Sequence, residues 1–227
     1  MEKYIYIETY GCTANRNNSE ILKGKLIQQG HKITNNLEIA ETIIINTCIV
    51  KGKTENKIFR RIQDLAKTYP NKQMLVSGCM TETNKKEIRK LNPKANFLEL
   101  NKKLLIPKIP DNKLIGITQI SEGCFGNCTY CKTRLAKGKL KSFDMNDIVK
   151  SVENDLKAGA KEIWITSQDN ANYGMDQDNK KQKLPELLNK ILDLKHRFKL
   201  RLGMMDPNNV LPILDNLIEI YKNKKIY

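Results

Sequence analysis

Three cysteines recur along the first third of the chain, each directly after a short β-type segment. Cys12, Cys48 and Cys79 are separated by 36 and 31 residues, an interval that holds one strand and one helix. The carboxyl ends of parallel strands meet at one sheet edge, where ligands bind. The spacing therefore predicts three thiols at one edge, enough for an iron–sulfur cluster with one open iron. The alternative is an inert core cysteine at position 48 and two accidental loop cysteines.

The segments between these cysteines alternate between strand and helix patterns. Residues 4–9, 43–45 and 74–76 carry the alternating or continuous apolar runs of strands. Start and stop signals predict three helices, which run from Asn18 or Ser19 to Gly30, from Thr54 to before Pro70, and over residues 84–91. This order predicts a three-layer α/β unit, in which helices cover both faces of a parallel sheet.

The same alternation resumes after a proline-containing stretch. Pro107 and Pro110 mark residues 101–113 as a linker between a first domain at 1–100 and a second at 114–227. In the second domain we expect strands at 114–121, 161–166 and 199–204, helices at 145–158, 184–197 and 208–221, and the first step of a fourth strand at Lys225–Tyr227. This pattern predicts the first part of a (β/α) barrel.

Basic residues outnumber acidic ones throughout the chain. The formal net charge is +15, and the basic residues are spread over 23–32, 51–61, 132–141 and 195–201. Such a surface attracts polyanions, so nucleic acid is the leading partner and a membrane surface the second. Lysines that simply fill solvated positions would give the same charge, which therefore does not decide the partner.

The sequence contains no pattern of a membrane or secreted protein. Residues 1–10 alternate between polar and apolar types, and no run approaches about 18 apolar residues. We therefore expect a cytoplasmic protein without a membrane span. In that compartment thiols stay reduced, so the six cysteines favour metal binding or catalysis over disulfides.

A second cysteine group has close spacing. Cys124, Cys128 and Cys131 form C-x3-C-x2-C directly after a predicted strand. Three thiolates on one loop can each ligate an iron of a 4Fe-4S cluster and leave the fourth iron open. A zinc site or a disulfide is the alternative, but zinc favours a fourth Cys or His, and the neighbouring sequence has none.

With Tyr130 as its aromatic residue, this motif resembles the signature of the radical S-adenosylmethionine enzymes. The resemblance implies that the amino and carboxylate groups of S-adenosylmethionine bind the open iron. It further implies that an electron from the cluster cleaves the sulfonium and yields a 5′-deoxyadenosyl radical. The second domain is then an incomplete radical-SAM partial barrel.

Other motifs resemble one family within this superfamily, the methylthiotransferases. They are Thr9–Asn15, Asn46–Cys48, Ser77–Met80 and Thr166–Asp169. The resemblance implies that Cys12, Cys48 and Cys79 hold a second 4Fe-4S cluster, which delivers sulfur to the substrate.

Residues 48–57 resemble the archaeal and eukaryotic branch of that family. This branch methylthiolates N6-threonylcarbamoyladenosine, the base 3′ to the anticodon in certain transfer RNAs. The implied partners are the anticodon loop of tRNA and an electron donor such as ferredoxin or flavodoxin. Isopentenyladenosine in tRNA and a ribosomal protein are the alternative substrates.

Gln168 and Asp169 follow a predicted barrel strand, at the end where catalytic residues of barrels lie. They are candidates for binding S-adenosylmethionine, and ordinary turn formation is the alternative. The sequence indicates no catalytic residue and does not predict the oligomeric state.

The second domain is short for its predicted architecture. A complete (β/α)8 barrel takes about 250 residues, whereas residues 118–227 provide three strand–helix pairs. We therefore expect a C-terminally truncated family member, without the β domain that grips tRNA and with little or no activity alone. A non-catalytic iron–sulfur protein or a zinc-containing RNA-binding remnant stays open as an alternative.

Overall fold

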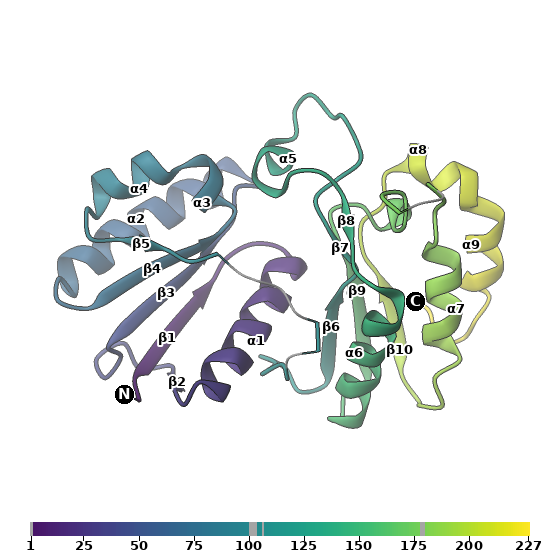
Figure 1. Ribbon diagram of the computed structural model, residues 1–227, viewed down its shortest axis with the longest axis horizontal. Helices are drawn as coiled ribbons and strands as arrows, with labels where there is room; N and C mark the ends of the chain where they lie inside the picture. The colour runs from purple at the N-terminus through teal and green to yellow at the C-terminus, as the bar shows by residue number, and fades with distance from the viewer. Residues whose placement is uncertain (1, 100–103, 106, 178–179) are drawn as a thin grey trace. The chain divides into compact units, whose positions relative to one another are not determined.

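The computed structural model describes residues 2–99, 104–105, 107–177 and 180–227, which form two compact units (Figure 1). Unit 1 comprises Met1–Ile109 and Tyr130–Ala136, and unit 2 comprises Pro110–Thr129 and Lys137–Tyr227. Residues 100–103 and 106 of the predicted linker lie outside the described residues.

Unit 1 is built on a five-stranded parallel sheet in the order β2-β1-β3-β4-β5. Its strands are β1 (Tyr4–Thr9), β2 (Lys32–Thr34), β3 (Thr42–Thr47), β4 (Gln73–Gly78) and β5 (Asn96–Phe97). Its helices are α1 (Thr13–Gln28), α2 (Gly52–Thr68), α3 (Met80–Thr83) and α4 (Lys85–Leu91). The predicted α/β fold class with a parallel sheet is confirmed.

Two cores lie on opposite faces of this sheet, because alternate side chains of a strand point to opposite sides. Ile43 and Ile45 of β3 pack in one cluster with Ile58 and Ile62 of α2, whereas Ile44 packs in the other. Figure 1 shows α1 on one face of the sheet and α2, α3 and α4 on the other. Because both faces are covered, all six residues of β3 are buried.

Helix α1 corrects the sequence-based expectation. It begins at Thr13, whereas we expected a cap at Asn18 or Ser19. Asparagine and serine compete with the helix backbone for hydrogen bonds and favour caps, which explains the prediction. In the fold these polar side chains are buried within the helix: Asn15 and Ser19 have no exposed area, and Asn18 is 2% exposed.

Unit 2 contains a parallel three-stranded sheet in the order β10-β9-β6 and a short antiparallel pair, β7 with β8. The strands are β6 (Ile115–Gln119), β7 (Ser121–Glu122), β8 (Lys141–Ser142), β9 (Glu162–Thr166) and β10 (Lys199–Leu202). The helices are α6 (Met145–Lys157), α7 (Leu184–Leu192), α8 (Pro207–Val210) and α9 (Leu214–Tyr221), with the 3-10 turns η1 (Asn170–Asn172) and η2 (Leu211–Ile213). Helix α5 (Lys132–Lys137) spans a boundary between the units.

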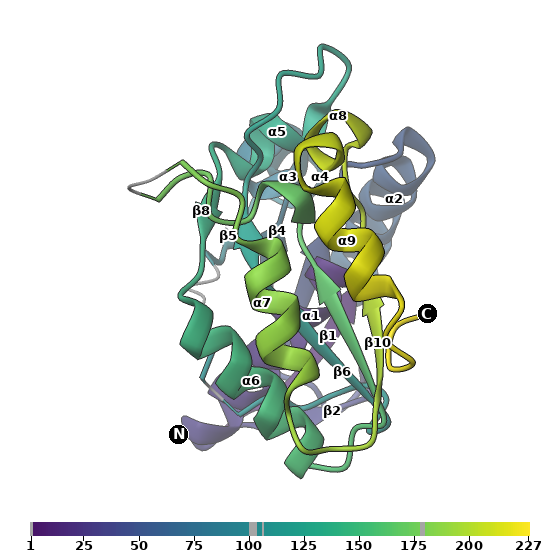
Figure 2. The same ribbon diagram turned by 90° about the vertical axis from the view of Figure 1, so that its right-hand side faces the viewer.

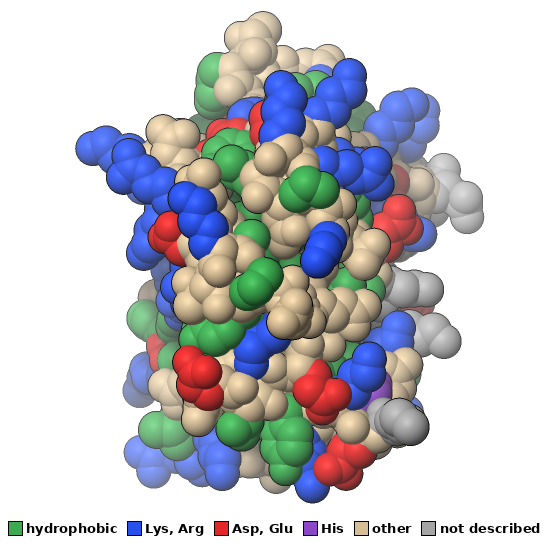
Figure 3. Space-filling model, turned by 90° about the vertical axis from the view of Figure 1, so that its left-hand side faces the viewer, with side chains coloured by type: hydrophobic (Ala, Val, Ile, Leu, Met, Phe, Trp, Pro, Cys, Tyr) green, Lys and Arg blue, Asp and Glu red, His purple; other side chains and the backbone are tan. Residues whose placement is uncertain are grey.

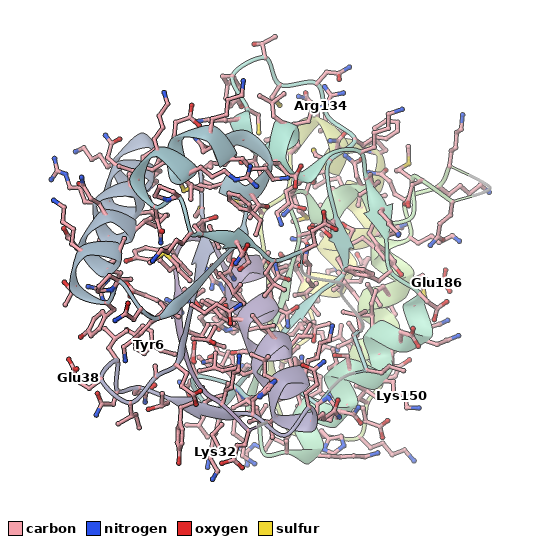
Figure 4. All side chains as sticks on the ribbon, turned by 60° about the vertical axis from the view of Figure 1, so that its left-hand side comes forward. Tyr6, Lys32, Glu38, Arg134, Lys150 and Glu186 are labelled. Carbon is pink, nitrogen blue, oxygen red and sulfur yellow. The ribbon has the colours of Figure 1, made fainter. Side chains whose placement is uncertain are left out.

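Helices α6, α7 and α9 run side by side in that order (Figure 2). Lys150 of α6 and Glu186 of α7 are exposed, with side chains pointing outward (Figure 4). The strand expected at the end of the chain is represented by a single parallel bridge between Leu200 and Ile226.

Two helices of unit 2 differ from the expected ranges. The helix expected over 184–197 ends at Leu192, and the one expected over 208–221 is divided into α8, η2 and α9. Pro212 lies at this break, where a proline ring removes a backbone donor and clashes with the preceding turn.

Candidate iron–sulfur centres

The loops of the first three cysteines meet at the carboxyl edge of the sheet in unit 1. The backbone N–H of Tyr10 donates to Asn46 O at 2.9 Å, and that of Cys79 donates to Thr47 O at 3.1 Å. These bonds continue the strand register past Thr9 and Gly78 into the loops. The three loops therefore meet at one edge of the sheet, whereas the predicted convergence of the three thiols stays a prediction.

The three thiols differ in exposure. Cys48 and Cys79 are 2% and 3% exposed, whereas Cys12 is half-buried. Burial raises the pKa of the Cys48 thiol, and backbone N–H groups of Val50, Cys12 and Ile49 that point at its sulfur oppose the shift. The Cys48 sulfur therefore lies against the Cys12 loop.

Two glycines leave room for this arrangement. Gly11 has a φ of +99°, and a Cβ on it would lie 2.4 Å from the Cys48 sulfur. Gly78 has a φ of +83°, and its Cβ would lie 2.4 Å from Thr47 O. Only glycine adopts these conformations without strain and has no Cβ to collide with the next loop. Each glycine directly precedes a cysteine, so the chain is shaped for close approach at this edge.

Buried side chains fasten the three loops to one another. Nδ2 of Asn15 donates to Tyr10 O at 2.9 Å and to Thr47 O at 2.7 Å, which joins the Cys12 loop to the Cys48 loop. Oγ1 of Thr47 donates to Ser77 O at 2.6 Å and accepts from Met80 N at 3.0 Å, which joins the Cys48 loop to the Cys79 loop. Neither role was predicted from the sequence, although both residues lie within three positions of a predicted ligand.

Several buried polar atoms at this edge have no partner among the described residues. They are Oδ1 of Asn15, Oδ1 of Asn46 and Oγ of Ser77. Buried polar atoms without a partner are uncommon and call for an explanation, such as an absent ligand. The thiol donors of Cys12, Cys48 and Cys79, with the two glycines beside them, fit a site that holds a sulfur-bound metal cluster.

The second cysteine group follows β7. Cys124 N donates to Gly138 O at 3.2 Å, and the Cys124 sulfur accepts from Gly126 N at 3.3 Å. A Cβ on Gly126 would lie 3.5 Å from the Cys124 sulfur and 4.0 Å from the Cys128 sulfur. The loop therefore folds around these two sulfurs, and Gly123, at a φ of +76°, allows its close pairing with Lys139. The thiol donors of this loop fit a cluster.

Cys131 belongs to the segment 130–136, which is part of unit 1, whereas Cys124 and Cys128 belong to unit 2. All six cysteines are described, and none forms a disulfide. Across the described residues, no group of three or more Cys, His, Asp or Glu side chains stands ready to hold a metal ion. The two ligand sets, Cys12, Cys48, Cys79 and Cys124, Cys128, Cys131, therefore stay predictions.

Gln168 and Asp169 lie past the carboxyl end of β9 and have different surroundings. The Asp169 carboxylate accepts hydrogen bonds from Ala171 N, Asn172 Nδ2, Asp206 N and Asn209 Nδ2, at 2.8–3.1 Å. These four bonds occupy both oxygens and fix the neighbouring turns. Oε1 of Gln168 is buried and has no hydrogen-bond partner among the described residues.

Fold comparison shows which solved structures share this architecture. The chain is similar to the cobalamin-dependent S-adenosylmethionine radical enzyme OxsB, with a TM-score of 0.56 and 9% identity over 96% of this chain and 42% of that one. It is equally similar to the radical S-adenosylmethionine methyltransferase TsrM from Kitasatospora setae. The TM-score is 0.56 and the identity is 10%, over 94% of this chain and 57% of that one. The chain thus shares the fold of the matched parts of these two enzymes. No helix among the described residues is long and apolar enough to cross a membrane.

Sequence comparison then shows which proteins the chain is related to. Residues 4–99 match the family described as Uncharacterized protein family UPF0004. The chain is 36% identical to a probable threonylcarbamoyladenosine tRNA methylthiotransferase of Methanothermobacter thermautotrophicus, over 98% of this chain and 58% of that protein. The human threonylcarbamoyladenosine tRNA methylthiotransferase is 29% identical to this chain, over 98% of this chain and 43% of the human protein. The recognition of the sequence as a relative of these methylthiotransferases is confirmed, and the chain spans 58% of the length of the first of them.

Proposed function

We propose that this chain carries the two cluster-binding units of an enzyme that methylthiolates N6-threonylcarbamoyladenosine in tRNA, 3′ to the anticodon. The observation that carries the proposal is the meeting of the Cys12, Cys48 and Cys79 loops at one sheet edge, beside glycines that make room for it. The substrate in this proposal is supported by the names of the relatives, which are threonylcarbamoyladenosine tRNA methylthiotransferases.

Each cysteine group has its own proposed task. Cys124, Cys128 and Cys131 would hold a 4Fe-4S cluster with an open iron, and Cys12, Cys48 and Cys79 would hold the second cluster. When bound, these clusters supply the electron that cleaves S-adenosylmethionine and the sulfur that reaches the substrate. Thiolates are the ligands that iron–sulfur clusters require, and a reducing compartment such as the cytosol keeps them available.

The protein itself contributes binding and orientation. Asn15 and Thr47 hold the three loops of unit 1 in register, so that the thiols do not have to be ordered when a cluster binds. The buried Oε1 of Gln168 is an acceptor suited to an amino or hydroxyl group of S-adenosylmethionine. Asp169 would act by holding the turn beside Gln168, because its oxygens are already bonded. The proposed source of the electron is a donor protein such as ferredoxin or flavodoxin.

The test is product formation with the modified substrate. The anaerobically reconstituted chain is incubated with threonylcarbamoyl-modified tRNA, S-adenosylmethionine and reductant, and the digested nucleosides are analysed by mass spectrometry. The proposal expects a methylthio product, from this chain or when polypeptide matching the remaining length of the relatives is added. Product on isopentenyladenosine only, or a chain that binds zinc without sulfide, would contradict it.

A further inference from the structure

A groove of about 440 Å³ runs along α2 in unit 1, outside the cysteine centre described above. Its cationic lining comes from Lys53, Lys57, Arg60 and Arg61, and Asp64 lies at its far end. Residues four and seven or eight positions apart share one face of a helix, so these side chains form one stripe. From Lys53 to Arg61 the stripe is about 12 Å long at 1.5 Å per residue.

Basic charge alone does not single out this groove. Figure 3 shows Lys and Arg side chains spread over one face of the molecule, with Asp and Glu side chains between them. The groove is distinguished by placing its cations on one helix face beside an aromatic ring. Within it, exposed Lys53 and Arg60 have no carboxylate partner among the described residues, whereas Arg61 is paired with Glu8. Lys132, by comparison, is paired with Glu55, and Lys32 with Glu2. Unpaired cations on one stripe keep their charge available to an external anion.

One wall of the groove is an aromatic ring. The ammonium of Lys57 lies 5.8 Å from the centre of the Tyr10 ring. The Tyr10 hydroxyl donates to Glu8, which also accepts from Nε of Arg61 at 3.0 and 3.2 Å. This pairing neutralises the Glu8 carboxylate and fixes the position of the ring. A held aromatic ring beside unpaired cations is the combination that binds single-stranded nucleic acid, with bases on the ring and phosphates on the cations.

The groove begins at the carboxyl edge of the sheet. Tyr10 lies two residues before Cys12, and Lys53 lies in the first turn of α2, which follows the Cys48 loop. A strand bound there is therefore held next to the edge where the three cysteine loops meet.

We propose that the α2 groove binds the phosphate backbone of a single-stranded RNA loop, with Tyr10 as the stacking surface for a base. This inference rests on the proposed function and assigns the tRNA contact of unit 1 to particular residues. An anionic membrane would also be attracted by the cations, but a fixed ring at the end of a narrow stripe favours a strand.

The experiment measures tRNA binding by the reconstituted chain as a function of salt. Lys53→Glu/Arg60→Glu is compared with Lys32→Glu/Lys94→Glu, which has the same net charge. Lys32 and Lys94 lie at the opposite, amino-terminal edge of the sheet, and the Lys32 side chain points away from the unit (Figure 4). All four residues are exposed, so both double variants should fold, which circular dichroism verifies.

The groove variant should bind tRNA at least tenfold more weakly than the control variant. Its salt slope should fall by about 1.4, at about 0.7 for each single-strand phosphate contact removed. Tyr10→Leu should weaken binding about tenfold and Tyr10→Phe by much less, since stacking needs the ring and the hydroxyl only helps to fix its position. Equal losses in the two double variants would overturn the proposal.

Two further outcomes distinguish a failure of this inference from a failure of the proposed function. In the first, the groove variants lose binding to phosphatidylserine vesicles but bind tRNA as well as the intact chain does. That result would overturn the proposal in favour of a membrane surface. Groove-dependent tRNA binding without any methylthio product would support this inference while contradicting the proposed function, because binding is measured without turnover.

Discussion

The Lys132 ammonium lies 2.7 Å from one carboxylate oxygen of Glu55 and 2.8 Å from the other, across 77 positions of sequence. Glu55 also accepts from Nδ2 of Asn84 at 2.8 Å. Lys132 directly follows Cys131, and Asn84 closes the short helix that follows Cys79. One carboxylate in unit 1 therefore fastens chain segments beside one cysteine of each predicted cluster.

Removing this carboxylate should destabilise unit 1 more than removing the lysine. The Glu55 side chain is 12% exposed and that of Lys132 is 45% exposed. Glu55→Ala leaves Asn84 and Lys132 without their partner and should cost about 2–3 kcal/mol of unfolding free energy. Lys132→Met should cost about 0.5–1 kcal/mol. Urea unfolding followed by circular dichroism measures both.

Glu82→Ala is the control for this comparison. Its pair with Lys85 is exposed and 3.9 Å long, so its loss should be within about 0.5 kcal/mol of zero. A loss in Glu55→Ala no larger than in Glu82→Ala would refute the role of this carboxylate.

The second prediction concerns Asn15, which has no exposed area and donates to two loop carbonyls. Asn15→Ala removes both bonds and leaves the Thr47 carbonyl without that donor, at an expected cost of about 2–3 kcal/mol. Asn36→Ala is the control, because Asn36 is exposed and its side chain accepts from Glu38 N within one turn. The same unfolding assay applies, and equal costs for the two variants would argue against the loop-joining role.

The third prediction separates backbone strain from collision. Gly78 and Gly30 have nearly the same φ, +83° and +84°, but a Cβ on Gly78 meets Thr47 O at 2.4 Å, whereas one on Gly30 meets nothing within 4 Å. Gly30→Ala should cost about 1 kcal/mol, the strain of the left-handed conformation alone. Gly78→Ala should cost at least about 2 kcal/mol more, because the Thr47 backbone must shift. Similar costs in the two variants would mean that the Thr47 backbone shifts without a penalty in unfolding free energy.

The fourth prediction distinguishes Gln168 from Asp169. Asp169→Asn should destabilise unit 2 by about 2–3 kcal/mol, because an amide nitrogen would face hydrogen-bond donors that now meet carboxylate oxygens. Gln168→Ala should leave the unfolding free energy within about 0.5 kcal/mol, since its Oε1 has no partner among the described residues to lose. It should nevertheless weaken S-adenosylmethionine binding by the reconstituted chain in calorimetry. Unchanged binding in Gln168→Ala would remove this residue from the proposed cofactor site.

The strands were predictable because their apolar runs are short and bounded by turn residues. The edge shared by Cys12, Cys48 and Cys79 followed from the strand–helix repeat alone. The start of α1 was not predictable in this way. Asparagine is typical of helix caps, so the local sequence predicted a cap here. Only contacts to other segments, such as that of Asn15 with Thr47 O, explain why these asparagines lie within a helix.

Long-range polar contacts were equally unpredictable from the sequence. The bond between Lys132 and Glu55 joins residues 77 positions apart, and no local pattern pairs them. The four hydrogen bonds of Asp169 come from two separate segments, which the fold alone brings together. Sequence spacing gave the chemistry of the cysteines, whereas the side chains that position them depend on tertiary structure.

The most direct test of the two-cluster account is iron and sulfide counting after anaerobic reconstitution. The intact chain should hold about eight irons with equal sulfide, and Cys48→Ala and Cys128→Ala should each hold about four, since each removes a ligand of one 4Fe-4S cluster. The double variant should hold almost none. An unchanged iron content in Cys48→Ala, or zinc without sulfide in the intact chain, would contradict the account.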